Sequence, residues 1–248
     1  ALLTNVRHSI QHYCEAHHGY HFDPAHPAVR LHEPTVGADE IFAATETMLS
    51  TFTTMGKKVR GFENIFAEFI GTKHCVMSNS GSSANLLAIG ALANPVTRDH
   101  LRPGDEVIVP ALSWSTTIWP LTQHALLPVF VDCNLDDLNL DVDKLEQAIG
   151  PKTRAITLVH VYGNPCNMDA ITALAKRRNL WLIEDSCEAM GASYNGQAVG
   201  TFGHVGSFSL FFSHHISTLE GGLSVANDFD LAETMRILRA HGWSREAD

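Results

Sequence analysis

The chain has 248 residues, of which 45% are hydrophobic and 18% charged, so it can bury a full core and wholesale disorder is excluded. Its 17 basic and 27 acidic residues give a net charge of −10, the wrong sign for a nucleic-acid-binding protein. No apolar run has the length of a membrane span, and the N-terminus lacks the apolar stretch of a secretory signal. Five cysteines without a C-x-x-C pair predict reduced thiols in a cytoplasmic protein.

Residues 1–35 differ from the rest of the chain and predict a peripheral, histidine-rich helical segment followed by a proline-rich crossing. Seven histidines lie here: His8, His12, His17, His18, His21, His26 and His32. The first two would share one face of a helix and could bind a metal ion. No carboxylate or cysteine completes a ligand set, so we predict no metal site.

Residues 36–248 predict one large α/β domain, because helical and strand-like segments alternate along it. Helical periodicity occurs at 39–51, 61–70, 83–93, 116–124, 142–149, 168–178 and 229–240. Short apolar runs, typical of strands buried on both faces, occur at 75–78, 106–110, 128–132, 155–160, 180–185, 207–211 and 222–226. The alternation predicts a mainly parallel central sheet flanked by helices. The final residues resemble the middle of a protein, so we expect a second, smaller C-terminal domain to be absent from this chain.

Two segments at predicted strand ends have the composition of ligand-binding loops. Residues 79–85, Asn-Ser-Gly-Ser-Ser-Ala-Asn, are small and polar and precede a helix whose first N–H groups can bind phosphate. Helix capping by Ser82 or Ser83 explains the same residues equally well. Trp114 follows the strand at 106–110 and could stack on a planar ring, although a place in the core is the simpler interpretation of a lone tryptophan.

Two later segments carry acid–base groups. Asp185 ends an apolar strand, where a buried carboxylate needs a cationic partner such as a protonated pyridine nitrogen, unless it caps a helix or turn. His214 and His215 follow an aromatic strand and precede Glu220-Gly221-Gly222. Either histidine alone would more often be structural than catalytic.

Taken in order, these four segments resemble the DegT/DnrJ/EryC/StrS family of pyridoxal-phosphate enzymes that act on nucleotide-linked sugars. The resemblance covers residues 36–248 and implies the large domain of a fold-type I transferase, with a homodimeric assembly. It also implies roles for individual residues. Ser82, Ser83 and Ser209 would hold the cofactor phosphate, Trp114 would stack on the pyridine ring, and Asp185 would pair with the ring nitrogen. Glu188 would lie near the ring hydroxyl.

The position of His214 departs from the aminotransferases of this family, which place there the lysine that binds the cofactor covalently. The six lysines of this chain are residues 57, 58, 73, 144, 152 and 176, so none follows Asp185. A histidine at this place resembles the 3-dehydratase branch, which acts on sugars such as GDP-4-keto-6-deoxymannose. The resemblance implies pyridoxamine phosphate as the working form, glutamate as amino donor, and His214 as the group that moves the proton.

Three alternatives remain open at the level of sequence. A 3-dehydrase acting on CDP-linked sugars would share the histidines but needs an iron–sulfur reductase, and the five cysteines form no cluster-binding set. A lysine-dependent sugar aminotransferase is disfavoured by the missing lysine. A non-enzymatic relative that only binds the cofactor is disfavoured because Trp114, Asp185 and an acid–base residue are all present.

Overall fold

The computed structural model describes residues 1–19, 22–28 and 35–244. The chain divides into two compact units, Ala1–Arg60 and Gly61–Asp248, with the division near the start of helix α3 (Lys57–Ile70). The sequence-based division between residues 35 and 36 stays a prediction. His21, His32 and part of the proline-rich crossing lie outside the described residues.

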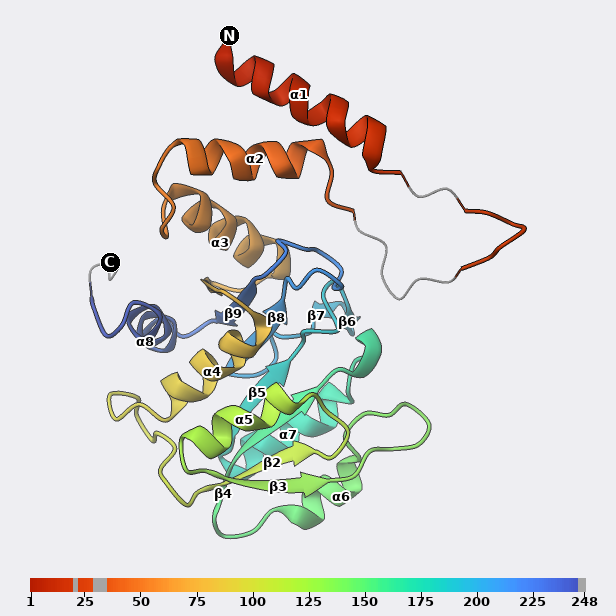
Figure 1. Cartoon of the computed structure of the whole chain (residues 1–248). Coiled ribbons are helices and arrows are strands. Elements are labelled where there is room, and N and C mark those ends of the chain that lie inside the picture. The colour runs from red at the N-terminus through yellow and green to blue at the C-terminus, as the bar shows by residue number, and fades with distance from the viewer. Residues whose placement is uncertain (20–21, 29–34, 245–248) are drawn as a thin grey trace. The chain divides into compact units, whose positions relative to one another are not determined.

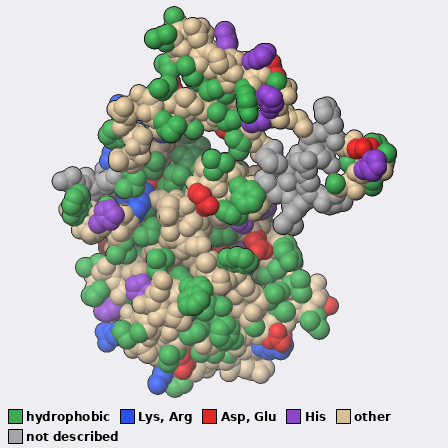
Figure 2. Space-filling model, viewed as in Figure 1, with side chains coloured by type: hydrophobic (Ala, Val, Ile, Leu, Met, Phe, Trp, Pro, Cys, Tyr) green, Lys and Arg blue, Asp and Glu red, His purple; other side chains and the backbone are tan. Residues whose placement is uncertain are grey.

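The first unit contains two helices, α1 (Leu2–His17) and α2 (Ala38–Leu49), which contact one another. The guanidinium of Arg7 lies 4.6 Å from the centroid of the Phe42 ring and forms an ion pair with Asp39 at 3.3 Å. Histidine side chains gather over α1 in the space-filling view (Figure 2). Among the described residues, no three His, Cys, Asp or Glu side chains are grouped so that they could hold a metal ion.

The second unit is built around a seven-stranded sheet in the order β1-β9-β8-β5-β4-β2-β3 (Figure 1). Its strands are β1 (His74–Ser78), β2 (Glu106–Pro110), β3 (Leu127–Val131), β4 (Thr153–Val159), β5 (Trp181–Asp185), β8 (Val205–Ser209) and β9 (Gly222–Ala226). Four neighbouring pairs are parallel, and only β9 runs antiparallel to its neighbours β1 and β8. The predicted α/β fold with a mainly parallel sheet is confirmed.

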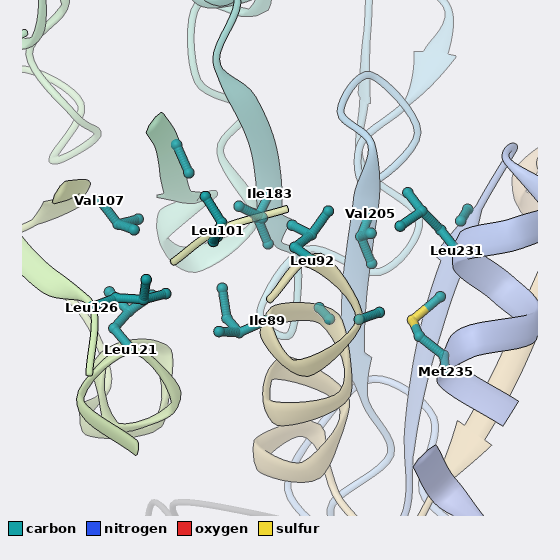
Figure 3. Packing of buried hydrophobic residues seen from close by; sticks show 14 of the residues in the cluster. Ile89, Leu92, Leu101, Val107, Leu121, Leu126, Ile183, Val205, Leu231 and Met235 are labelled. Atoms are coloured by element: carbon teal, nitrogen blue, oxygen red, sulfur yellow. The ribbon is translucent and has the colours of Figure 1, made fainter. Parts of the chain in front are cut away.

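Helices cover both faces of this sheet because its strands are apolar on both sides. One face carries α4 (Gly81–Leu92), α5 (Ser115–Gln123) and α8 (Phe229–Arg239), and the other carries α6 (Val142–Ala148) and α7 (Met168–Arg178). Figure 3 shows Leu92 of α4 between Ile183 of β5 and Val205 of β8, with Ile89 on the side of α4 that faces Leu121 of α5. The core of the second unit therefore fixes the ends of these strands relative to the helices.

The predicted elements match the structure with small shifts at their ends, and one strand is displaced. The apolar run at 207–211 predicts a strand there, but β8 is Val205–Ser209. Its pairing with β5 begins at Val205, and its register with β9 ends at the pair of Ser209 and Gly222. A hairpin of two short strands, β6 (Ser193–Tyr194) and β7 (Gln197–Ala198), and a single 3-10 turn at Val161–Gly163 are not anticipated by the sequence.

Candidate active site

The carboxyl ends of β4, β5 and β8 meet the start of α4 at a pocket on one edge of the sheet. Ligands of parallel sheets bind at this edge. The lining residues are Ser80, Gly81, Ser82, Trp114, Thr116, Thr117, Val159, Asp185, Cys187, Glu188, Ser209, Phe211, His214 and Glu220. Six of the seven residues predicted from sequence are thus brought together, although they span more than half of the chain.

Ser83 is the predicted residue that does not line the pocket. Its backbone N–H donates a hydrogen bond of 3.1 Å to the Ser80 hydroxyl, and this bond caps α4. Its own hydroxyl accepts a hydrogen bond of 3.2 Å from the Ser80 hydroxyl. Capping therefore belongs to Ser80, not to Ser82 or Ser83. The role of Ser83 in phosphate binding stays a prediction, and its backbone lies in the first turn of α4.

The start of α4 lies unusually close to β8. A Cβ atom on Gly81 would come within 2.7 Å of the Ser209 Cβ and 2.9 Å of the Cys187 Sγ, so only glycine fits here. The approach places the hydroxyl groups of Ser82 and Ser209 in the same pocket as the first N–H groups of the helix. Such an arrangement binds anions, because these N–H groups have no partner within the helix and lie at its positive end.

Asp185 is buried at the end of β5, with 4% of its surface exposed. Its Oδ2 accepts hydrogen bonds from Asn85 Nδ2 at 2.8 Å and Thr117 Oγ1 at 2.7 Å, and its Oδ1 accepts one from the Cys187 N–H at 3.2 Å. All three donors are neutral. A carboxylate buried among neutral donors at a pocket wall is suited to a cationic ligand group.

Trp114 precedes α5 at the rim of the pocket and is 71% exposed. Its indole is therefore not part of the core, which removes the simpler interpretation of this residue. An exposed indole at a pocket edge is available to stack on a planar ring.

His214 lines the pocket and is half-buried, whereas His215 is exposed and is not a lining residue. Burial lowers the pKa of His214 below its usual range, and the neighbouring His215 acts in the same direction. Glu188 and Asp185 oppose this shift but do not reverse it. The lowered pKa favours the neutral imidazole, the form that can accept a proton.

Glu188 lies between this pocket and a smaller apolar one beside it, lined by Leu112, Val161 and Tyr162 among others. Its Oε2 accepts a hydrogen bond at 2.9 Å from the N–H of Tyr162, which has a left-handed backbone with φ of 52°. The carboxylate thus holds the turn after β4 against the pocket.

Several residues that line the pocket or contact its lining have no role assigned from sequence. Thr117 and Asn85 hydrogen-bond to Asp185, from which they are 68 and 100 residues away in the sequence. No local sequence pattern predicts a contact between residues so far apart. Cys187 lies between Asp185 and Ser209, and burial raises the pKa of its thiol well above the usual range, so it is not a thiolate nucleophile.

Comparison with known proteins agrees with the resemblance inferred from sequence. Residues 34–248 match the DegT/DnrJ/EryC1/StrS aminotransferase family. The chain is 48% identical to a GDP-4-keto-6-deoxy-D-mannose 3-dehydratase of Yersinia pseudotuberculosis, over 83% of this chain and 52% of that protein. It is 45% identical to the protein of the same name from Escherichia coli O55:H7, over 82% and 53%.

A solved structure of an E. coli GDP-4-keto-6-deoxy-D-mannose-3-dehydratase with bound hydrated pyridoxal phosphate is also similar. It superposes with a TM-score of 0.85 at 43% identity, covering 89% of this chain and 57% of the other. The chain spans about half the length of the curated relatives it matches.

Proposed function

Because this chain belongs to the DegT/DnrJ/EryC1/StrS aminotransferase family, we propose that it forms the cofactor-binding part of a pyridoxamine-phosphate-dependent sugar dehydratase. The enzyme removes the C3 hydroxyl of a nucleotide-linked 4-keto-6-deoxy sugar, as the names of its relatives say of those proteins. The single observation that carries the proposal is His214, a half-buried histidine in a pocket whose described lining residues include none of the six lysines.

The pocket fits pyridoxamine phosphate. Ser82, Ser209 and the start of α4 suit its phosphate, Asp185 suits its protonated ring nitrogen, and Trp114 suits its ring face. Glu188 would lie near the ring hydroxyl, and Ser83 would support the phosphate turn. When bound, the cofactor supplies a primary amine for the sugar ketone and a ring that takes up electrons.

His214 would perform the proton transfers. As a neutral imidazole it accepts a proton from the cofactor carbon that bears the amine, and as an imidazolium it can return that proton to the departing C3 hydroxyl. Asp185 holds the ring nitrogen protonated, which makes the ring a better electron acceptor. A histidine cannot bind the cofactor covalently as a lysine does, so the cofactor would be held by these contacts alone.

The remaining parts of the proposal concern partners. Glutamate would restore the amine, and a solved relative is described with a trapped pyridoxal phosphate–glutamate adduct. We also propose a homodimer, because Trp114, Trp119 and Tyr162 are 71%, 59% and 83% exposed. A cytoplasmic location agrees with five free cysteines among the described residues. No helix in the described part of the chain is long and apolar enough to cross a membrane.

Mass spectrometry of the products tests the proposed reaction. The purified protein is incubated with pyridoxamine phosphate, glutamate and a GDP-, CDP- or dTDP-linked 4-keto-6-deoxy sugar. Dehydration and hydrolysis would give a keto sugar one oxygen lighter than the substrate, together with ammonia and 2-oxoglutarate. An amino sugar as product would identify an aminotransferase. Turnover that requires an added iron–sulfur reductase would favour the CDP-sugar 3-dehydrase type.

A further inference from the structure

Four elements meet at the carboxylate of Asp185. Asn85 comes from α4, Thr117 from α5, Ser207 from β8, and Asp185 itself ends β5. All four side chains are at least 95% buried, and they are linked by hydrogen bonds. A buried chain of hydrogen bonds of this kind restricts the position of every member.

The orientation of the Asn85 amide follows from the network. The Ser207 hydroxyl donates to Asn85 Oδ1, so Asn85 Nδ2 faces Asp185 and donates to Oδ2. The reverse orientation would set the amide oxygen against the carboxylate, with two acceptors facing one another. Ser207 therefore acts on Asp185 through Asn85.

The bonds also decide which part of the carboxylate remains available. Oδ2 receives two strong donors, and Oδ1 receives the longer bond from the Cys187 N–H. A carboxylate offers about four acceptor positions, so one position remains. A weak donor, the Cys187 thiol, lies beside the remaining position, and a charged donor readily displaces it.

We propose that Asn85, Thr117 and Ser207 are positioning residues that fix the orientation of the Asp185 carboxylate and leave one acceptor position for the ring nitrogen of the cofactor. Neutral donors stabilise the carboxylate without competing for its charge. With the network intact, the shared proton stays on the ring nitrogen. Without it, the carboxylate can turn away and its pairing with the ring nitrogen weakens. This inference rests on the proposed function.

The test compares binding of two probes, pyridoxamine phosphate and its 1-deaza analogue, in which a carbon replaces the ring nitrogen. Binding is measured by equilibrium dialysis with the purified protein, without any sugar. The variants are Asn85→Leu and Thr117→Val, which remove a donor at nearly constant volume, and Ser207→Ala, which releases the Asn85 amide. Thr157→Val is the matched control, because Thr157 is a buried threonine whose hydroxyl has no hydrogen-bond partner.

We expect Asn85→Leu and Thr117→Val each to raise the Kd of pyridoxamine phosphate about tenfold, the usual effect of losing a hydrogen bond to a charged group. The effect of Ser207→Ala should have the same sign. The Kd of the 1-deaza analogue should stay within about twofold of its wild-type value in all variants, and Thr157→Val should change neither probe. Labelling the ring nitrogen with ¹⁵N should show its protonated fraction at pH 7 falling in the two donor variants.

If a variant binds both probes more weakly and by the same factor, the network has only a structural role and the inference is wrong. The inference is also wrong if binding of neither probe is weakened. If Asn85→Leu does not fold, Thr117→Val decides the matter, because its control carries the identical substitution. A wild-type protein that binds neither probe would instead refute the proposed function itself, so the two failures are distinguishable.

Discussion

At the scale of single residues, His214 owes its chemistry to partial burial beside another histidine. Burial disfavours the imidazolium and lowers the pKa, and a charged His215 would lower it further. A reaction that needs neutral His214 has its maximal rate above this pKa. The rate falls as the pH drops through the pKa. The acid limb of the pH–rate profile should therefore lie below about pH 6.5, the ordinary pKa of histidine.

Replacing the neighbour tests this account. In His215→Asn the pKa of His214 should rise, since one source of repulsion is gone, and the acid limb should move to higher pH. The rate on the plateau near pH 8 should stay within about threefold of wild type, because His215 takes no proton from the substrate; mutational effects away from reacting groups are usually small. The measurement is kcat/KM against pH. A plateau that collapses while the limb stays in place would make His215 the base.

Glu184, next to Asp185, has a structural task. Its carboxylate is fully buried and accepts hydrogen bonds from the N–H groups of Gly200 and Gly203 and from His160 Nε2 at 3.1 Å. His160 Nδ1 accepts the N–H of Cys166, so the proton of this neutral ring lies on Nε2. Glu184 thereby ties two loops to β5, below the pocket.

Glu184→Gln should lower the free energy of unfolding by about 1–3 kcal/mol, because the amide group would face a donor and leave it unpaired. The same substitution at Glu146, which is half-exposed and paired with Arg177 at 2.8 Å, should change it by less than about 0.5 kcal/mol. Urea denaturation of both variants measures the difference. If both substitutions changed the free energy of unfolding equally, the buried hydrogen bonds of Glu184 would contribute no more to stability than the exposed ion pair of Glu146.

The residues that sequence could predict are those with a local signature. Asp185 ends an apolar strand, and His214 lies in a recognisable motif, so both were found. Asn85 and Thr117 were not, since their partner is distant in sequence. A faint signal existed for Asn85, a polar residue on the otherwise apolar buried side of α4.

At the scale of elements, the turn that begins α4 depends on one glycine of β9. A Cβ atom on Gly222 would come within 2.0 Å of the Ser80 carbonyl oxygen and 2.6 Å of the Gly81 nitrogen, both backbone atoms that cannot rotate away. Since β9 pairs with both β1 and β8, this contact fixes the turn before α4 against the sheet.

Gly222→Ala should therefore lower the free energy of unfolding by about 1–3 kcal/mol through overpacking and also weaken binding of pyridoxamine phosphate. Gly61→Ala is the control, since Gly61 lies in helix α3 with open space around its Cα. That variant should raise stability by about 0.5–1 kcal/mol and leave binding unchanged. Thermal denaturation measures the stability, and equilibrium dialysis measures the binding of pyridoxamine phosphate. If Gly222→Ala binds the cofactor as the wild type does, the contact from β9 does not support the site.

Element type was predictable because helices and buried strands differ in periodicity and length. The direction of β9 was not, because an apolar run buried on both faces reads the same whether it pairs parallel or antiparallel. The displaced end of β8 has a similar cause. The aromatic residues after Ser209 continue the apolar pattern, yet Phe211 lines the pocket and Phe212 is exposed.

At the scale of the whole molecule, the second unit places its chemistry at one edge of the sheet and its cores on the two faces. The six predicted residues in the pocket arrive from the ends of β2, β5 and β8 and from the start of α4. None of the six lysines lines this pocket within the described residues. If the proposed function holds, the cofactor is bound without covalent attachment and a histidine moves the proton.

The most direct test is the intact mass of the protein after incubation with pyridoxal phosphate and reduction by borohydride. The wild-type mass should be unchanged, because reduction attaches the cofactor only where a lysine has condensed with it. His214→Lys should gain the mass of one reduced cofactor, located by peptide mapping at residue 214. A wild-type protein that gains this mass on any lysine, or a His214→Lys protein that folds and gains nothing, would contradict the account.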